Sequence, residues 1–488
     1  MRERSPLTRV LFAPTPQPPL PAYLHVTGLH QNKELQLLRT TRRTLTWCFD
    51  ARSIPYILVY VHTCPDSTIA SSSASVVVTR RLYRSSRDAL AHRLTKTSRH
   101  MAQGEKGSSG CLGSTPLLDG YHVPAEWETH ERTWMLWPVR PDTWKESARP
   151  AQLAFAAVAK AIVRFEPVTV GVPSSQLQSA QPLLDASGVD IAVIEQDDAW
   201  IRDTGPTFVV GGARSEGSER QRGMQNVRGV DWSFNAWGGE FGGCFSNWDK
   251  DDAIASTVLG LVGADRYKAN MVLEGGSIHV DGEGTVITTE ECLLNPNRNP
   301  TFTKSEIEKH LRDYLGVKLV LWLGKGVTGD VDTDGHVDNL VAFVRPGEVV
   351  LHWTDDTEDP QHAVSLDALR RLGAFVDARG RQLKVHKCPL PGPLYTTEGD
   401  VSSLKHTSGS RERAQGDRLA ASYVNFYLVN GAVILPGYGV PEDEAAVRLF
   451  KALYPDREVI QVDTRSVALG GGNIHCITQQ QPVGATRG

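Results

Sequence analysis

The chain has 488 residues, 40% of them hydrophobic, which is enough for a sizeable core in one large domain or about two to three average ones. Its formal net charge of −4 at pH 7 excludes the overall basic surface typical of proteins that bind nucleic acids or acidic membranes. Seven cysteines stand at wide spacings with no CxxC pair, so the sequence predicts neither a disulfide framework nor a zinc site and favours a reducing compartment. The longest apolar run, residues 54–61, is much shorter than the roughly 20 residues of a membrane-spanning helix.

The first hundred residues differ from the rest in charge and pattern. Residues 1–100 carry 15 basic and 5 acidic side chains, a net charge of +10, so the remainder carries −14. They are rich in Arg, Ser and Thr, and they show little helix or strand periodicity. We therefore expect a disordered leader over residues 1–115, or an extension ahead of a start at Met101, and a globular domain over residues 116–485. The protein would then be cytoplasmic, and an organelle transit peptide is the alternative interpretation of the leader.

In chain order, the globular part begins with closely spaced tryptophans and then alternates helices with apolar strands. The periodicity of apolar residues predicts a helix at 151–164 and strands at 168–172, 270–280, 285–289, 340–344 and 348–352. Two segments rich in Ser, Gly and Arg, 211–223 and 402–415, are interpreted as surface insertions.

One unit recurs three times: a helix, an apolar strand and then a loop with a chemically active side chain. The strands of the three copies are residues 189–194, 317–322 and 458–462, with helices at 305–315 and 442–453 before the second and third. Their loops lead to Asp203, His336 and Cys476 respectively. Repeated units place corresponding loops around a common axis. We therefore expect residues far apart in the sequence to meet in one pocket of an α/β fold.

The stretch Gly470–Cys476 is a glycine run that ends in a cysteine, shortly after the third strand. Glycines allow the backbone to approach other groups closely, so this cysteine can face a tight pocket. A thiol becomes an effective nucleophile as the thiolate, which nearby positive charge favours. The alternative is a buried structural cysteine, which is the commoner role of an arbitrary cysteine.

Four polar residues upstream can supply the rest of a reactive site. His336 and Asp338 are two apart, and on a strand this spacing points both side chains to one face for acid–base work. Glu274 ends an apolar run, and a carboxylate at the end of a buried strand needs a partner, for which His336 is the candidate. Asp203 follows Arg202 directly, so a surface ion pair is its simpler interpretation.

A metal site is the alternative from another class of function. It would be a divalent-metal-binding module with the ligands Asp330, Asp332, Asp334 and His336. A hydrogen-bonded structural histidine is a further alternative for His336. Considered together, however, a cysteine, a histidine and three carboxylates suit a guanidinium substrate. Carboxylates pair with guanidinium through two parallel hydrogen bonds, while a thiolate can attack its central carbon.

Seven stretches between residues 120 and 480 carry a family resemblance. They are Pro124–Trp137 (PAEWETHERTWMLW), Asp197–Pro206 (DDAWIRDTGP), Asn235–Gly239 (NAWGG), Leu273–Gly276 (LEGG), Thr333–Asp338 (TDGHVD), Tyr423–Tyr427 (YVNFY) and Gly470–Cys476 (GGGNIHC). Through them the chain resembles the agmatine deiminase family of the guanidino-group-modifying, or pentein, superfamily. The resemblance implies a five-bladed, pseudo-symmetric α/β propeller. The leader before Met101 has no counterpart, and neither predicted insertion carries a family motif.

The resemblance also implies a role for each matched residue. Cys476 would be the nucleophile, Asp203 and Asp338 would clamp the guanidinium, His336 would act as general acid and then base, and Glu274 would orient His336. The implied reaction is hydrolytic deimination of agmatine to N-carbamoylputrescine and ammonia through an amidino-cysteine intermediate, in polyamine biosynthesis. It requires no metal or organic cofactor and no nucleic-acid or membrane partner, and a homo-oligomer is expected.

The rest of the substrate site is constrained less by the sequence. Trp200 is expected to line the aliphatic stem of agmatine, and Asp332 or Asp334 to lie near its amine. Trp127 and Trp237 are further candidates for the pocket wall, with core packing as the alternative for both. The nearest alternative function is a peptidylarginine deiminase, which would use the same catalytic residues in a more open site.

Overall fold

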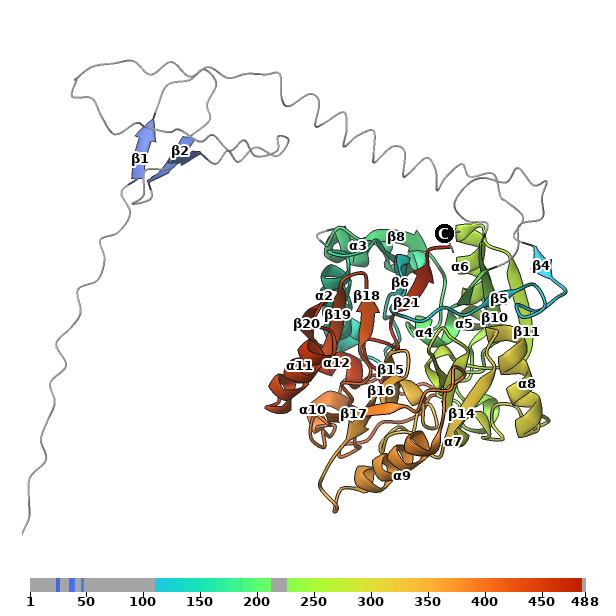
Figure 1. Cartoon of the computed structure of the whole chain (residues 1–488). Coiled ribbons are helices and arrows are strands. Elements are labelled where there is room, and N and C mark those ends of the chain that lie inside the picture. The colour runs from blue at the N-terminus through green and yellow to red at the C-terminus, as the bar shows by residue number, and fades with distance from the viewer. Residues whose placement is uncertain are drawn as a thin grey trace, which may run out of the picture. The chain divides into compact units, whose positions relative to one another are not determined.

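The computed structural model describes residues 110–185, 187–211 and 226–484, together with the backbone of three short strands near the N-terminus (Figure 1). The chain divides into two compact units, Met1–Ser98 and Arg99–Gly488. In the first unit, β1 (Tyr23–Val26), β2 (Leu35–Arg39) and β3 (Leu45–Trp47) pair as an antiparallel sheet. The rest of the predicted leader, and almost all of the predicted insertion at 211–223, lie outside the described residues.

The second unit contains five sheets among its described residues. The first two, in their spatial order, are β21 (Gln479–Pro482), β6 (His130–Leu136), β7 (Val168–Val172) and β8 (Asp190–Val193), and then β4 (Cys111–Leu112), β11 (Arg266–Val272), β10 (Val227–Ser233), β9 (Thr207–Gly211) and β5 (Tyr121–His122). The other three are β12 (Ile278–Val280), β13 (Thr285–Thr289) and β14 (Leu319–Leu323); β15 (Val341–Arg345), β16 (Glu348–Trp353) and β17 (Lys384–Pro389); and β18 (Tyr427–Val429), β19 (Ala432–Gly437) and β20 (Glu458–Asp463).

All five sheets share one connection pattern. Each contains one of the antiparallel pairs β21–β6, β9–β10, β12–β13, β15–β16 and β18–β19. The second-named strand of each pair also pairs in parallel with the strand that follows it in the chain, which is β7, β11, β14, β17 or β20. A parallel pair needs a crossover, and helices supply it. The crossover helices are α2 (Arg149–Ile162), α6 (Ile254–Val262), α8 (Lys304–Leu315), α9 (Pro360–Ala374) and α11 (Glu442–Leu453). The helix-and-strand part of the unit predicted from the sequence therefore occurs in all five sheets, and the predicted α/β class is confirmed.

The long crossover helices α8, α9 and α11 lie at the periphery of this unit (Figure 1). Helix α8 shows how the sequence sets such a boundary. Thr303 and Glu306 form a reciprocal capping box at its first turn, and Gly316, with φ of 67°, ends it in the left-handed conformation. Its buried positions, Ile307 and Leu311, recur at helical spacing and pack into the same apolar cluster as β11 and β13. Each peripheral helix thus buries one stripe against its sheet.

Most predicted elements occur close to their expected bounds. The helix at 442–453 and the strand at 168–172 match α11 and β7, and the helix at 151–164 corresponds to α2. Trp134, Trp137 and Trp144 are almost fully buried in the first apolar cluster, which is the default role of closely spaced aromatics. No helix in the described ranges is long and apolar enough to span a membrane.

Candidate active site

The predicted catalytic residues follow strands of four different sheets. Asp203 follows β8 and lies in the short helix α4 (Ile201–Thr204), Glu274 follows β11, His336 follows β14 and Cys476 follows β20. Each of these strands pairs in parallel with an inner strand of its sheet. The repeat therefore delivers one chemically active side chain from each of four sheets to a common region.

Cys476 is buried, with 5% of its surface exposed. A Cβ added at Gly472 would lie 3.0 Å from Cys476 Sγ and 2.5 Å from the ring of Trp200, so a glycine is required to leave room for the thiol. Asn425, just before β18, donates from Nδ2 to Cys476 Sγ at 3.2 Å and accepts at Oδ1 from the Cys476 backbone N–H at 3.4 Å. These contacts hold the thiol in one orientation.

Two buried carboxylates and a histidine meet beside this thiol. Asp338 Oδ2 lies 3.5 Å from Cys476 Sγ, and Asp203 Oδ1 accepts from the Gly276 backbone N–H at 2.9 Å. A Cβ added at Gly276 would lie 2.5 Å from His336 Nδ1 and 3.0 Å from an oxygen of each aspartate. Gly276 therefore marks the point at which the three side chains converge.

His336 and Asp338 do not lie on a strand, so the prediction made from their spacing is wrong. Residues 337–339 form a 3-10 helix, η5 (Val337–Asn339), with His336 at its N-terminal cap position. Asp334 (φ 55°) and Gly335 (φ 86°) turn the chain into this helix through left-handed backbone conformations. The two side chains therefore converge because of a tight turn and not because of strand alternation.

His336 is fully buried among acidic groups, yet neither of its ring nitrogens has a hydrogen-bond partner among the described residues. Nδ1 is 3.9 Å from Asp203 Oδ1, and Nε2 is 3.9 Å from Glu274 Oε2. Burial opposes the charged ring, but Asp203, Cys292 and Glu274 outweigh it and raise the pKa of His336 well above its ordinary value. The free site thus holds an imidazolium whose protons are not committed to another group.

Glu274 is kept ionised by an arginine behind it. Arg298 Nε donates to Glu274 Oε1 at 2.7 Å, and both side chains are fully buried. Burial by itself would raise the pKa of this carboxyl, but Arg298 and His336 lower it to about 2. Glu274 can therefore stay negative beside His336 throughout a reaction cycle.

The thiol and one carboxylate have pKa values shifted in the same direction. Burial, followed by Asp338 and Asp203, raises the pKa of the Cys476 thiol well above its ordinary value. Burial also raises the pKa of Asp203 to about 6, despite the nearby His336. A cation bound between the carboxylates would oppose both shifts, because it stabilises the anionic form of each group.

A cavity lined in part by Trp200 and Trp237 leads to Cys476. Trp200 stacks on Trp144 at 5.1 Å between ring centroids, and Trp237 donates from Nε1 to Asp203 Oδ2 at 2.9 Å. Trp127 instead packs against two apolar core clusters. The structure therefore places Trp200 and Trp237, but not Trp127, at the cavity wall.

Asp332 and Asp334 have different partners, although they are two residues apart. Asp332 lines the cavity, and its Oδ2 is 3.0 Å from Arg413 Nη2. Asp334 Oδ2 accepts from Arg298 Nη1 at 2.7 Å and from Asn297 Nδ2 at 2.8 Å. Of the two carboxylates predicted for the amine end, only Asp332 faces the cavity.

The segment 402–415, predicted as a surface insertion, has no buried residue and lies at the surface, but one of its side chains also reaches the site. Arg413 lines the cavity and donates from Nη2 to the Gly470 carbonyl at 2.6 Å. The Arg411 backbone N–H donates to the Cys244 carbonyl at 2.9 Å. Polar residues of this segment thus form an ion pair and hydrogen bonds at the cavity. A loop that makes such contacts has the same polar composition as a fully solvated loop, so the sequence does not distinguish the two.

The four residues of the alternative metal site are engaged separately. Asp330 accepts from the hydroxyl of Thr333 and from the His336 backbone N–H, while Asp332 and Asp334 pair with different arginines. In the part of the chain that the structure describes, the groups with metal-ligand spacing are Glu126–His279–His475 and Glu274–Cys292–His336. The geometry therefore gives no support to the predicted acidic cluster.

Five residues of the site were not singled out from the sequence: Gly276, Arg298, Arg413, Asn425 and His475. Gly276, Asn425 and His475 lie within three of the stretches that carry the resemblance, so the motifs contained a signal for them. Arg298 and Arg413 lie outside every motif, and their roles depend on tertiary contacts alone.

Comparison with known proteins agrees with this geometry. The Porphyromonas-type peptidyl-arginine deiminase family matches residues 122–482. An agmatine deiminase of Pseudomonas aeruginosa (strain LESB58) is 53% identical over 370 residues, which cover 76% of this chain and 97% of that one. One of Ectopseudomonas mendocina (strain ymp) is 52% identical over 372 residues, covering 76% and 98%.

A solved structure shows the same relationship in three dimensions. The agmatine deiminase of Enterococcus faecalis superposes with a TM-score of 0.71 at 42% identity, covering 77% of this chain and 100% of that one. The chain therefore belongs to the agmatine deiminase group within the Porphyromonas-type peptidyl-arginine deiminase family.

Proposed function

We propose that this protein hydrolyses agmatine to N-carbamoylputrescine and ammonia, with Cys476 as nucleophile. The observation that carries the proposal is the position of Asp338 and Asp203 beside the Cys476 thiol, at the end of a tryptophan-walled cavity. Two carboxylates can hold a guanidinium with its carbon exposed to an adjacent sulfur. The relatives that match this chain over nearly their whole length are agmatine deiminases, which supports the same substrate.

The clamp is prepared for a cation. Asp338 Oδ1 has no hydrogen-bond partner among the described residues, although the residue is only 1% exposed. An unpaired buried carboxylate oxygen is costly, and a guanidinium N–H satisfies it. Binding also places positive charge beside Cys476, which lowers the pKa of its thiol and releases the proton to solvent. The substrate therefore helps to generate the thiolate that attacks it.

The reaction then runs in two halves. The thiolate forms a C–S bond with the guanidinium carbon, and His336 protonates the departing nitrogen as the C–N bond breaks and ammonia leaves. Neutral His336 then takes a proton from water, whose oxygen attacks the amidino carbon. The C–S bond breaks, N-carbamoylputrescine leaves and the thiolate returns. Glu274, held by Arg298, keeps the ring oriented and favours its charged form.

The other end of agmatine carries an ammonium group, and Asp332 is its proposed partner. Trp200 and Trp237 flank the aliphatic stem between the two charged ends. In the free site Asp332 pairs with Arg413, so the substrate ammonium would share this carboxylate with Arg413 or replace it. Asp334 is excluded from this role because it is bound by Arg298 and Asn297.

A peptidylarginine deiminase is the second candidate, favoured by the description of the matching family. A peptide substrate must bring its backbone to the cavity mouth. Arg413 bonds to the Gly470 carbonyl and to Asp332 at that cavity, which narrows the room for a peptide and supports the small substrate.

Further features are part of the same proposal. The five sheets with one shared connection pattern support a five-bladed propeller. We also propose that residues 116–485 form the catalytic domain, that the protein acts in polyamine biosynthesis in the cytoplasm, and that it assembles as a homo-oligomer.

The test measures ammonia release from purified protein given agmatine, free arginine or a peptide-borne arginine, each with EDTA present. We expect fast release from agmatine, N-carbamoylputrescine as co-product and little release from the other two. Release only from the peptide would transfer the function to the second candidate. Loss of activity in EDTA, restored by a divalent metal, would contradict the proposed steps, which use only side chains and water.

A further inference from the structure

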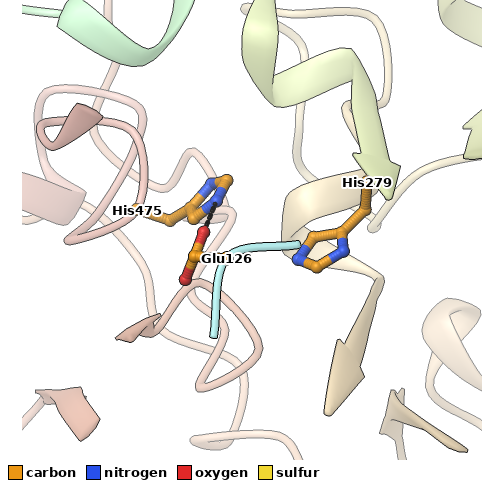
Figure 2. A group of neighbouring side chains, drawn as sticks. All are labelled: Glu126, His279 and His475. Atoms are coloured by element: carbon orange, nitrogen blue, oxygen red, sulfur yellow. Dashed lines mark hydrogen bonds and ion pairs between the residues drawn. The ribbon is translucent and has the colours of Figure 1, made fainter. Parts of the chain in front are cut away.

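His475, the residue before the nucleophile, lies between two carboxylates that come from distant parts of the chain. Its Nδ1 is 2.8 Å from Asp338 Oδ2, and its Nε2 is 2.9 Å from Glu126 Oε2. Figure 2 shows the contact with Glu126, which is on the segment between β5 and β6, and the ring of His279 nearby. His475, Glu126 and Asp338 are each at most 5% exposed. The three side chains therefore form a buried line that ends at the proposed guanidinium clamp.

Both ring nitrogens of His475 face carboxylate oxygens, and an imidazole can donate from both nitrogens only as the cation. Burial and Arg202 oppose that charge, but Glu126 and Asp338 outweigh them and raise the pKa of His475. In return His475 lowers the pKa of Glu126, to about 2, and that of Asp338, in both cases against burial. The line is thus an imidazolium between two carboxylates.

Other charged groups around His475 fit this assignment. Arg202, in α4, has its Nη2 3.6 Å from Glu126 Oε2, so Glu126 balances two cations. His279, on β12, stacks on His475 with ring centroids 5.9 Å apart, and burial lowers the pKa of His279 to about 4. His279 is therefore neutral and adds no second charge against the imidazolium.

The spacing of Glu126, His279 and His475 also suits a metal ion. A metal would need a lone pair on His475 Nε2, whereas that nitrogen donates to Glu126. Arg202 beside Glu126 would also repel a second cation. The geometry favours the protonated histidine, and metal binding becomes an outcome of the test.

We propose that His475 is a positioning residue for the reaction, which uses its two hydrogen bonds to fix Asp338 between Glu126 and the substrate. The inference rests on the proposed function, in which Asp338 clamps the guanidinium. Asp338 presents two different oxygens: Oδ2 accepts from His475, whereas Oδ1 has no partner within residues 110–185, 187–211 and 226–484. His475 therefore leaves one oxygen for the substrate and sets the direction in which it points.

The cationic ring also keeps Asp338 ionised next to other buried acids. An oxygen of Asp203 and one of Asp338 each lie 3.0 Å from the position that a Cβ on Gly276 would occupy. The two carboxylates are therefore neighbours, and neighbouring like charges raise each other's pKa. Without the imidazolium, Asp338 would take up a proton at higher pH than it does now. Its affinity for a cation would then be lost on the acid side of the pH profile.

The test compares His475→Gln, His475→Asn and Glu126→Gln with the unmodified protein. The glutamine variant loses the donor to Asp338, while the asparagine variant can keep a neutral donor near the Nδ1 position. We expect the KM for agmatine to rise about ten- to hundred-fold in His475→Gln, a range typical of residues that orient a ligand through a hydrogen bond. His475→Asn and Glu126→Gln should show smaller increases, and kcat should change less than KM.

The pH profile distinguishes positioning from mere support of the fold. In the unmodified protein Asp203 sets the acid limb of kcat/KM; in His475→Gln this limb should become steeper and begin at higher pH, because Asp338 loses the cation that holds it ionised and titrates together with Asp203. His386→Gln is the matched control, since His386 Nε2 is 2.7 Å from Glu348 Oε2 in an equivalent pair remote from the site. It should leave KM and the profile unchanged. Thermal unfolding of each variant identifies those that fold.

Several outcomes would overturn the inference. A His475→Gln protein with unchanged KM and profile, or one whose kcat/KM falls equally at every pH, would assign His475 a structural role. Should His475→Gln not fold, an unshifted acid limb in Glu126→Gln would have the same meaning. Activity of the unmodified protein that is lost on chelation and restored by Zn²⁺ would assign the cluster to a metal. An unmodified protein inactive on agmatine would instead contradict the proposed function.

Discussion

The two histidines of the active site are about equally buried, but their surroundings differ in one respect. Both ring nitrogens of His475 make short hydrogen bonds, at 2.8 and 2.9 Å, to Asp338 and Glu126. The ring of His336 has carboxylate oxygens only at 3.9 Å, and neither nitrogen has a hydrogen-bond partner in the described chain. Both rings have raised pKa values, since acidic groups outweigh burial in each case.

The difference separates two functions that the residue type alone cannot separate. Each of the two N–H protons of His475 is held in a strong hydrogen bond of its own, so neither is available for transfer and the ring suits the fixed placement of a carboxylate. A charged ring with uncommitted N–H groups can give its proton to a leaving nitrogen and accept another from water. In the proposed mechanism it is therefore the contacts, and not the charge, that favour proton transfer by His336 and positioning by His475.

The largest predicted effect belongs to His336, the proposed general acid and base. His336→Asn should lower kcat by about 10²- to 10⁴-fold, because it removes a general acid–base group that acts in both halves of the reaction. The loss in His475→Gln should be smaller and fall mainly on KM. Steady-state kinetics of both variants check this, and equal losses in kcat would remove the distinction between the two rings.

The next effect tests the point at which the site converges. Gly276→Ala should lower kcat/KM about 100-fold, because its Cβ would lie 2.5 Å from His336 Nδ1 and displacements of about 1 Å are costly in catalysis. Gly373→Ala is the control, since a Cβ there, in α9, meets nothing within 4 Å. A fully active Gly276→Ala protein would show that this convergence is unnecessary for turnover.

The pH dependence should follow Asp203. Burial raises the pKa of its carboxyl to about 6, and only the anion can bind a guanidinium. As pH falls through about 6, Asp203 becomes neutral, so kcat/KM for agmatine should fall; above that pH the limb should be flat. Trp237→Phe removes a hydrogen bond that stabilises the Asp203 anion, so the pKa of Asp203 should rise and the acid limb of kcat/KM should move to higher pH. A profile that stays flat well below pH 6 would contradict this assignment.

The smallest effect concerns the amine end of the substrate. Asp332→Asn should raise the KM for agmatine about tenfold, the equivalent of one hydrogen bond to a charged group. The KM for butylguanidine, which lacks the amine, should not change. Asp334→Asn should leave the preference for agmatine over butylguanidine intact, since Asp334 contacts Arg298 and not the cavity. Equal loss of preference in both variants would exclude Asp332 as the specific amine partner.

The sequence predicted the fold class and most of the repeated elements, because apolar periodicity and chain breaks are local properties. It found three copies of the unit and not five. Two sheets were missed. In the sheet that contains β11, Glu274 comes only two residues after the strand, and the sheet that contains β17 contributes no residue to the predicted catalytic set. Without a conspicuous polar residue at the expected spacing, these copies were not recognised as repeats.

For the candidate site, too, the sequence predicted what is encoded in local stretches and missed what depends on contacts between distant residues. Cys476, His336 and the carboxylates could be identified because each stands in a distinctive local stretch. His475 and Asn425 lie within such stretches, but their contacts with Glu126 and Cys476 span 349 and 51 residues, and no local pattern encodes them. The strand geometry considered for His336 and Asp338 does not occur, because a spacing of two also fits a tight turn with positive φ at Asp334.

The central claim is that Cys476 forms a covalent bond with the guanidinium carbon. The direct measurement is mass spectrometry of the protein quenched with acid during turnover of agmatine, followed by digestion. We predict that the peptide containing Cys476 gains the mass of agmatine less ammonia, and that Cys476→Ser, folded by its unfolding temperature, neither gains mass nor releases ammonia. A modified Cys244 or Cys292, or full turnover by Cys476→Ser, would contradict the account.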